Sequence, residues 1–249
     1  MTVHVRRGGP DGPALVLLHG LGATGDVWRA VADAWPGRWV VPDLPGHGRS
    51  APLPEYTYDS LATALAPVVP TDRPVVVLGH SLGGVLALAL GSGSYGPSAG
   101  AVCGLGVKVR WTGQELAKAA ELADRPVKVF ATRDEAAERA LKVAGLWQLV
   151  AADSPLVDDA LVESADGWRL ALDPRAYAVG APDMTALITA SKARVVLAAG
   201  ARDPMCPPEH LFAVAVDSVV LPGLGHNAHV EKPDALAPLL ARLRACLGG

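Results

Sequence analysis

The sequence predicts an α/β fold, with a mostly parallel, doubly wound sheet flanked by helices. Short apolar runs rich in β-branched residues recur along the chain, as expected for strands buried on both faces of a parallel sheet. Segments with apolar residues at helical spacing separate the first of these runs, which is the pattern of a sheet covered by helices. The chain has 249 residues, half of them hydrophobic, and can bury the core of one large domain.

Predicted strands alternate with predicted helices through the first hundred residues. We expect a half-exposed edge strand at Val3 and Val5, where apolar and polar residues alternate. Buried strands are expected over residues 14–18, 39–41 and 74–78, and helices over 27–35, 58–69 and 84–90.

The pattern changes after a further strand over residues 101–107. From 110 to 191 it is helical with little strand signal, and two pairs, Thr112 with Glu115 and Thr132 with Glu135, have capping-box spacing. Further helices are expected over 155–163 and 183–190, strands over 193–200 and 218–221, and a last helix from Pro233. We therefore expect an α/β core domain of residues 1–109 and 192–249, with a helical lid inserted at 110–191.

Composition indicates what kind of partner the protein binds and where in the cell it is expected. Only 19% of residues are charged and the net charge is -3, which favours a small neutral or apolar ligand over nucleic acid or an anionic membrane. The N-terminus lacks an apolar stretch of signal-peptide length, so we expect a cytoplasmic protein. Three widely spaced cysteines, at 103, 206 and 246, show no metal-ligand pattern and suit buried, reduced thiols. The sequence does not decide whether the protein is a monomer or a homodimer.

One motif organises the chain: Gly79-His80-Ser81-Leu82-Gly83. It follows a predicted strand and leads into a predicted helix, the context in which a G-x-S-x-G sequence forms a nucleophile elbow. The tight turn brings strand and helix so close that the flanking residues must be glycine. Ser81 at the apex is therefore the expected nucleophile.

A serine nucleophile needs a histidine base and an orienting carboxylate, which parallel strands can bring together only at their carboxyl ends. Asp203 follows the strand that ends at Gly200, and His226 follows the strand that ends near Leu221. The order Ser81, Asp203, His226 is the one expected for such a sheet.

The sequence resembles the α/β-hydrolase family at five places, spread over nearly all of the chain outside the expected lid. These are His19–Gly22, Asp43–Ser50, Gly79–Gly83, Gly200–Asp203, and Gly225-His226 with Glu231 and Pro233 downstream. The resemblance favours His226 over its rival His229 as the base, because the family places the base after such a Leu-Gly pair. Serine at the apex argues against the branches that use aspartate there, the epoxide hydrolases and haloalkane dehalogenases.

The other histidines have simpler interpretations. His19 and His47 lie in turns and are expected to hold loop backbone, and the side chain of His80 should point away from the site because side chains alternate along a strand. No carboxylate follows the strand over 101–107, so the alternative acid position of some family members is empty.

The expected reaction is acyl transfer, with backbone N–H groups of Leu21 and Leu82 as the oxyanion hole and no metal or organic cofactor. The preferred function is hydrolysis of a carboxylic ester of a small or medium apolar acyl group. The sequence leaves other activities possible: thioesterase, lactonase, carbon-carbon bond hydrolase and cofactor-free perhydrolase. It also allows a ligand receptor with vestigial turnover. The candidates for the pocket lining are Trp28, Trp111, Trp147, Met184, Met205 and Cys206.

Overall fold

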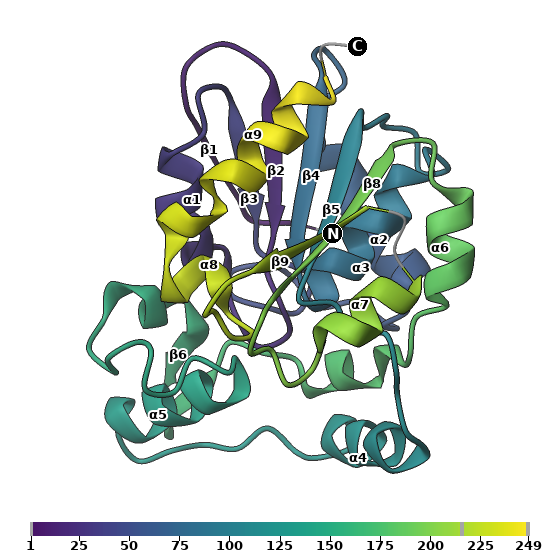
Figure 1. Cartoon of the computed structure of the whole chain (residues 1–249). Coiled ribbons are helices and arrows are strands. Elements are labelled where there is room, and N and C mark those ends of the chain that lie inside the picture. The colour runs from purple at the N-terminus through teal and green to yellow at the C-terminus, as the bar shows by residue number, and fades with distance from the viewer. Residues whose placement is uncertain (1, 215–216, 248–249) are drawn as a thin grey trace.

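A twisted sheet forms the centre of the molecule (Figure 1). The structure, a computed structural model, describes residues 2–214 and 217–247. Within them the main sheet has seven strands in the order β1-β3-β2-β4-β5-β8-β9, and all neighbours are parallel except β1 and β3. The strands are β1 (Val5–Gly8), β2 (Ala14–Leu18), β3 (Trp39–Pro42), β4 (Val75–His80), β5 (Ala101–Leu105), β8 (Arg194–Gly200) and β9 (Ser218–Leu221). The expected mostly parallel sheet is confirmed, although its edge strand begins at Val5 rather than Val3.

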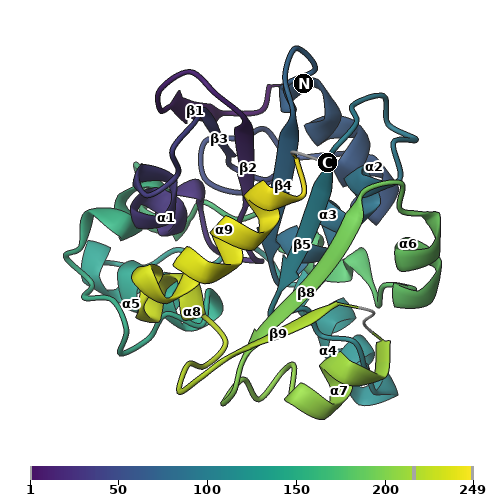
Figure 2. The ribbon, with the colours of Figure 1, turned by 45° about the horizontal axis from the view of Figure 1, so that its top comes forward.

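Helices cover both faces of this sheet (Figure 2), because alternate residues of each strand point to opposite sides. Val76 and Leu78 of β4 pack under one layer of helices, whereas Val75 and Val77 pack under the other. The first layer holds α1 (Arg29–Asp33), α8 (Ala228–Glu231) and α9 (Ala237–Ala245), with the 3-10 turns η1 (Gly25–Trp28) and η5 (Pro233–Leu236). The second holds α2 (Tyr58–Leu65), α3 (Leu82–Gly91), α6 (Met184–Ala190) and α7 (Pro208–Val214), with η2 (Ala66–Val68).

The residues between β5 and β8 form an additional layer at the carboxyl ends of the strands (Figure 1). We call residues 110–191 the inserted segment. It contains α4 (Gly113–Ala123), α5 (Arg133–Val143), η3 (Pro155–Ala160), β6 (Leu161–Ser164), β7 (Gly167–Leu170), η4 (Pro174–Val179) and α6. The capping boxes at the starts of α4 and α5 are present, and α6 packs with the second helical layer of the core.

The inserted segment is not wholly helical, and this corrects the sequence-based expectation. The helix expected over 155–163 is a 3-10 turn that ends at Ala160, and Leu161 starts a two-stranded antiparallel hairpin. Backbone contacts from a distant residue, Phe130, extend this hairpin by pairing with Trp168. A short strand stabilised by such a partner leaves little periodicity in its own sequence. Among the described residues, no helix is both long enough and apolar enough to cross a membrane.

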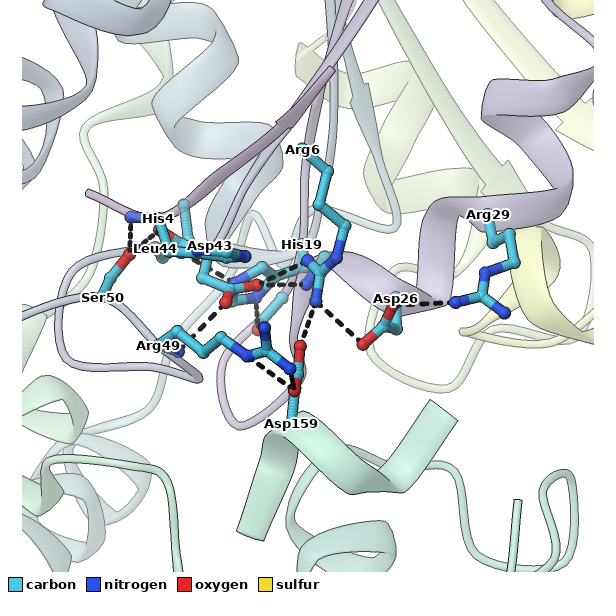
Figure 3. Close-up of polar contacts among 12 residues, drawn as sticks. His4, Arg6, His19, Asp26, Arg29, Asp43, Leu44, Arg49, Ser50 and Asp159 are labelled. Carbon is cyan, nitrogen blue, oxygen red and sulfur yellow. Dashed lines mark hydrogen bonds and ion pairs between the residues drawn. The ribbon is translucent and has the colours of Figure 1, made fainter. Parts of the chain in front are cut away.

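An ion-pair network joins the inserted segment to the core (Figure 3). Arg6 of β1 lies among three carboxylates: it contacts Asp26 at 3.0 Å, Asp43 at 3.3 Å, and Asp159 of η3. Arg49 also contacts Asp159, at 2.6 Å. Burial alone would raise the pKa of Asp43, but the His19 ring, two backbone N–H donors and the charge of Arg6 together lower it. Asp159 is thus the residue through which the inserted segment enters this network.

We expect Asp159→Asn to loosen the attachment of η3 to the core. Loss of the two arginine contacts should lower the free energy of unfolding by about 1 to 2 kcal/mol, since the pairs are only partly buried. Hydrogen exchange should accelerate in residues 155–164. The matched control is Asp158→Asn, which removes an exposed pair with Arg133 inside the inserted segment. Equal effects of the two variants on exchange at the core boundary would contradict this role of Asp159.

Candidate active site

Ser81 occupies a strained turn between β4 and α3. Its backbone has φ 50° and ψ -115°, a conformation that residues other than glycine rarely adopt. The turn is tight because a Cβ on Gly79 would lie 1.9 Å from the carbonyl oxygen of Gly83, and a Cβ on Gly83 would lie 2.3 Å from that of Leu18. The flanking glycines predicted for the elbow are therefore required sterically. Ser81 is brought to the carboxyl edge of the sheet, at the start of a fully buried helix.

Asp203 and His226 meet at the same edge, in the loops after β8 and β9. The Nδ1–H of His226 donates to Oδ2 of Asp203 at 2.9 Å. The other carboxylate oxygen accepts backbone N–H groups of Met205 at 2.8 Å and Cys206 at 3.2 Å. Burial alone would raise the pKa of Asp203, but the His226 hydrogen bond and these two N–H donors lower it. The carboxylate therefore stays ionised and fixes one nitrogen of the imidazole, leaving Nε2 to exchange protons.

Ser81 and His226 line one cavity of about 470 Å³, together with Met205 and residues of the inserted segment. Within the described chain no hydrogen bond joins the Ser81 hydroxyl to the His226 ring. Catalytic hydrogen bonds of unliganded enzymes are often long and tighten when substrate binds. The structure thus places Ser81 and His226 on one cavity, and the buried Asp203 is already bonded to His226.

Two backbone N–H groups lie beside Ser81 as expected for an oxyanion hole. Leu82 is the first residue of α3, where helix N–H groups have no partner within the helix. Leu21 follows Gly20 at the end of β2, and all three residues line the cavity. In the described part of the chain, the backbone hydrogen bonds of turns and caps leave the N–H groups of Leu21 and Leu82 without a carbonyl acceptor. Leu21 and Leu82 therefore remain the predicted oxyanion donors.

His19 and His47 hold loop backbone, which confirms their predicted role. The Nδ1–H of His19 donates to the carbonyl of Gly20 at 2.8 Å, and its Nε2 accepts the N–H of Leu44 at 2.8 Å. His47 bonds through Nδ1 to the carbonyl of Pro45 at 3.1 Å. Burial lowers the pKa of His47 to about 3, so the ring is neutral at physiological pH.

His80 corrects a prediction, because its ring lies beside the site rather than away from it. Its centroid is 4.6 Å from that of His226, and its Nε2–H donates to the carbonyl oxygen of His226 at 3.0 Å. Burial, reinforced by the neighbouring histidines, lowers the pKa of His80 well below its ordinary value. A neutral His80 therefore anchors the backbone that carries His226.

His229, the rival base, lies on the far side of His80 and is buried against Trp28, with ring centroids 4.3 Å apart. Burial lowers the pKa of His229 to about 3. Among the described residues its Nδ1 has no hydrogen-bond partner, so no carboxylate orients this ring. The geometry accordingly favours His226.

Of the six residues predicted to line the pocket, Trp111 and Met205 do so. The other four were wrong: Trp28, Met184 and Cys206 are buried in the core, and Trp147 is 41% exposed beside Lys142. Residues that the sequence analysis missed take their places. Those from the inserted segment that line the cavity include Glu115, Leu116, Leu122, Val143 and Tyr177.

Two further residues support the site structurally. Gly106 has φ 62°, and a Cβ there would lie 3.1 Å from Oδ2 of Asp203 and 3.2 Å from Nδ1 of His226. Glu231 accepts the N–H of Gly225 at 2.8 Å and so fixes the loop before His226. Glu231 could be found from the sequence because it belongs to the family motif. Gly106 lies after the strand where the alternative acid position of some family members is empty.

One cluster outside this site has the residue types of a metal centre. Potential ligand atoms of His4, Asp43 and Asp159 all lie within 4.8 Å of one another. The guanidinium of Arg6 contacts both carboxylates, and Arg49 contacts Asp159 as well. These arginines already balance the negative charge, so the cluster fits an ion-pair network better than a cation site.

The geometry defines a strand–serine–helix turn with an Asp–His pair at the carboxyl edge of a parallel sheet. A family model described as the alpha/beta hydrolase family matches residues 15–239, and the chain belongs to this family. It is 36% identical over 183 residues to lipase LipV of Mycobacterium tuberculosis, covering 69% of this chain and 68% of that protein.

Other similar proteins have different names. The chain is 30% identical over 259 aligned positions to 2-succinyl-6-hydroxy-2,4-cyclohexadiene-1-carboxylate synthase of Escherichia coli O139:H28, covering 98% of this chain and 99% of that one. The solved structure of E-2-(acetamidomethylene)succinate hydrolase superposes with a TM-score of 0.80 at 17% identity, covering 99% of this chain and 95% of that one. At this identity the superposition shows a shared fold, and fold alone does not define the reaction.

We expect Asp203→Asn to weaken the pH dependence of the free energy of unfolding at acid pH. The folded-state pKa of Asp203 is below its ordinary value of 3.8, so its contribution is present above that pH and is lost as pH falls through the folded-state pKa. Without this carboxyl, the free energy of unfolding should depend less steeply on pH below about 5, by at most about 1.4 kcal/mol per pH unit. Urea unfolding at a series of pH values measures this slope. Asp234→Asn, which changes an exposed carboxylate in η5, is the control, and an equal slope for Asp203→Asn and the native chain would contradict the assignment.

Proposed function

We propose that the protein is a serine hydrolase that cleaves a carboxylic ester of a small or medium acyl group through an acyl-enzyme on Ser81. The observation that carries this proposal is that His226, hydrogen-bonded to the buried Asp203, lines the same cavity as a serine on a strained strand–helix turn. This arrangement supplies a nucleophile, a base and an orienting carboxylate. The name of the similar lipase LipV supports an ester as the substrate class.

In the proposed cycle, Nε2 of His226 takes the proton of the Ser81 hydroxyl as its oxygen attacks the ester carbonyl. The N–H groups of Leu21 and Leu82 bind the tetrahedral oxyanion. The carbon–oxygen bond to the alcohol then breaks, and His226 gives its proton to the leaving oxygen. A water molecule repeats these steps on the acyl-enzyme, which releases the acid and restores Ser81.

Asp203 and the backbone donors act mainly by stabilising charge. The imidazolium formed on His226 lies against an ionised carboxylate that keeps its position through two backbone N–H bonds. An oxyanion donor contributes on the order of 3 kcal/mol to the transition state when it is fixed in a site of low dielectric constant. The protein's own residues supply every group in this cycle.

We propose that the inserted segment serves as the lid of this cavity over the core of residues 1–109 and 192–249. Trp111 and Leu116 from this segment line the same cavity as Ser81 and contribute to its largely apolar wall. Such a wall excludes water from the reacting ester and favours acyl groups that bury hydrocarbon.

We expect Ser81→Ala to abolish esterase activity. In a panel of aryl esters, acyl thioesters and lactones, the native chain should prefer the oxygen esters, and the variant should lose at least about 10⁴-fold in kcat for its best substrate. Ser94→Ala, at an exposed serine beyond the far end of α3, is the matched control. Mass spectrometry of the quenched native enzyme should show the acyl group on the peptide that contains Ser81.

Two results would contradict the proposal. No turnover of any panel member at high enzyme concentration excludes an esterase. Tight binding with turnover slower than minutes favours a ligand receptor instead.

A further inference from the structure

A second cavity of about 350 Å³ lies next to the catalytic one within the inserted segment. Leu122 of α4, Val143 of α5 and Tyr177 of η4 line both cavities, so the two spaces are adjacent at these side chains. The rest of its wall is mostly apolar and includes Phe130 and Leu170. The aliphatic part of a ligand would bury apolar surface along this shared wall.

The charges around the second cavity are all positive. Arg125, Lys128 and Arg139 line it, and its lining contains no carboxylate. Composition does not predict this bias, since the whole chain has 25 acidic and 22 basic residues. Together the two linings hold six lysines and arginines and a single carboxylate, that of Glu115.

The three cations of the second cavity also differ from those of the first in their partners. Lys108, Lys118 and Lys142 of the catalytic cavity each contact a glutamate: Glu115, Glu121 and Glu138 respectively. By contrast, within residues 2–214 and 217–247 no ion pair within 4.0 Å engages the cations of the second cavity. Lys128 instead lies over the Phe130 ring, 4.7 Å from its centroid. Three cations around an apolar wall attract an anion, and among the described residues none of them is held in an ion pair within 4.0 Å, although the charge of Arg125 acts on the nearby Glu121.

We infer that the second cavity binds an anionic group at the far end of the ester whose carbonyl reacts at Ser81. The substrate class is therefore an ester that carries a carboxylate or similar anion several bonds from the reacting carbonyl. This inference rests on the proposed esterase function and refines it. Hydrocarbon along Leu122, Val143 and Tyr177 buries apolar surface, while Arg125, Lys128 and Arg139 stabilise the remote charge. Binding energy from such a remote group also positions the reacting carbonyl.

Matched substrate pairs test this inference. One pair is the aryl monoester of a medium-length dicarboxylic acid and the aryl ester of the monocarboxylic acid of equal length, which places the anion on the acyl half. A second pair carries the carboxylate on the alcohol half instead. We expect kcat/KM to favour the anionic member of at least one pair by about tenfold, and the pair that shows this preference identifies the half bound in the second cavity. The preference should shrink at high salt, because these cations are exposed.

Variants then assign the preference to the three cations. Each single change, Arg125→Gln, Lys128→Gln or Arg139→Gln, should lower the anionic-to-neutral ratio of kcat/KM about two- to fivefold. Arg139→Glu should lower it further, because it places a like charge near the ligand anion. Arg110→Gln, at an exposed arginine of the same segment that lines neither cavity, is the matched control. The neutral ester reports folding and catalysis in every variant.

The outcomes separate the two proposals. If the native enzyme hydrolyses neutral esters through Ser81 but shows no preference for either anionic ester, the inference about the second cavity is wrong and the esterase proposal stands. The same conclusion follows if the preference survives in the triple glutamine variant. If neither neutral nor anionic esters acylate Ser81, the esterase proposal itself fails.

Discussion

The close approach of β4 and α3 is the constraint on which the site depends. Gly79 and Gly83 allow backbone contacts that any Cβ would block, and the turn between them holds Ser81 at φ 50°. Strain of this kind persists only when the surrounding structure fixes it, and here every residue of α3 is buried. The energy that stabilises the turn therefore comes from packing of an apolar helix on the sheet, and the serine is placed as a consequence.

A second constraint comes from the cluster of histidines near the site. Five of them lie near the carboxyl edge, and burial lowers the pKa values of His19, His47, His80 and His229. Only His226 contacts a carboxylate that other donors already keep ionised. His226 is thus the ring in this group that a carboxylate orients. His80, held neutral, fixes the backbone of that position through a single hydrogen bond.

Local sequence was enough to predict features that depend on neighbours along the chain. The strands of the parallel sheet, the elbow glycines and the capping boxes of α4 and α5 belong to this class, because each arises from steric or hydrogen-bonding rules within a few residues. The Asp203–His226 contact was also predictable, since parallel strands place their following loops at one edge. The β6–β7 hairpin was missed because Phe130, about thirty residues away, helps to form it. Trp28 and Met184 were assigned to the pocket because a sequence cannot tell which large apolar residues face a cavity and which face the core.

The inserted segment is anchored unevenly, and this bears on how a substrate reaches Ser81. On the side of α5 and η3, Asp159 joins the Arg6 network and the side chain of Asn227 donates to the carbonyl of Gly145 at 2.9 Å. On the other side α4 has no buried residue, although its apolar residues Leu116 and Leu122 line the catalytic cavity. Moving α4 therefore exposes less apolar surface than moving any buried helix, whereas moving α5 breaks ion pairs and unpacks buried alanines. Of the two helices, α4 is thus the one whose movement would unpack no buried residue. The firmly held α5 carries Arg139 and Val143 of the neighbouring cavity and keeps them at a fixed place relative to the core.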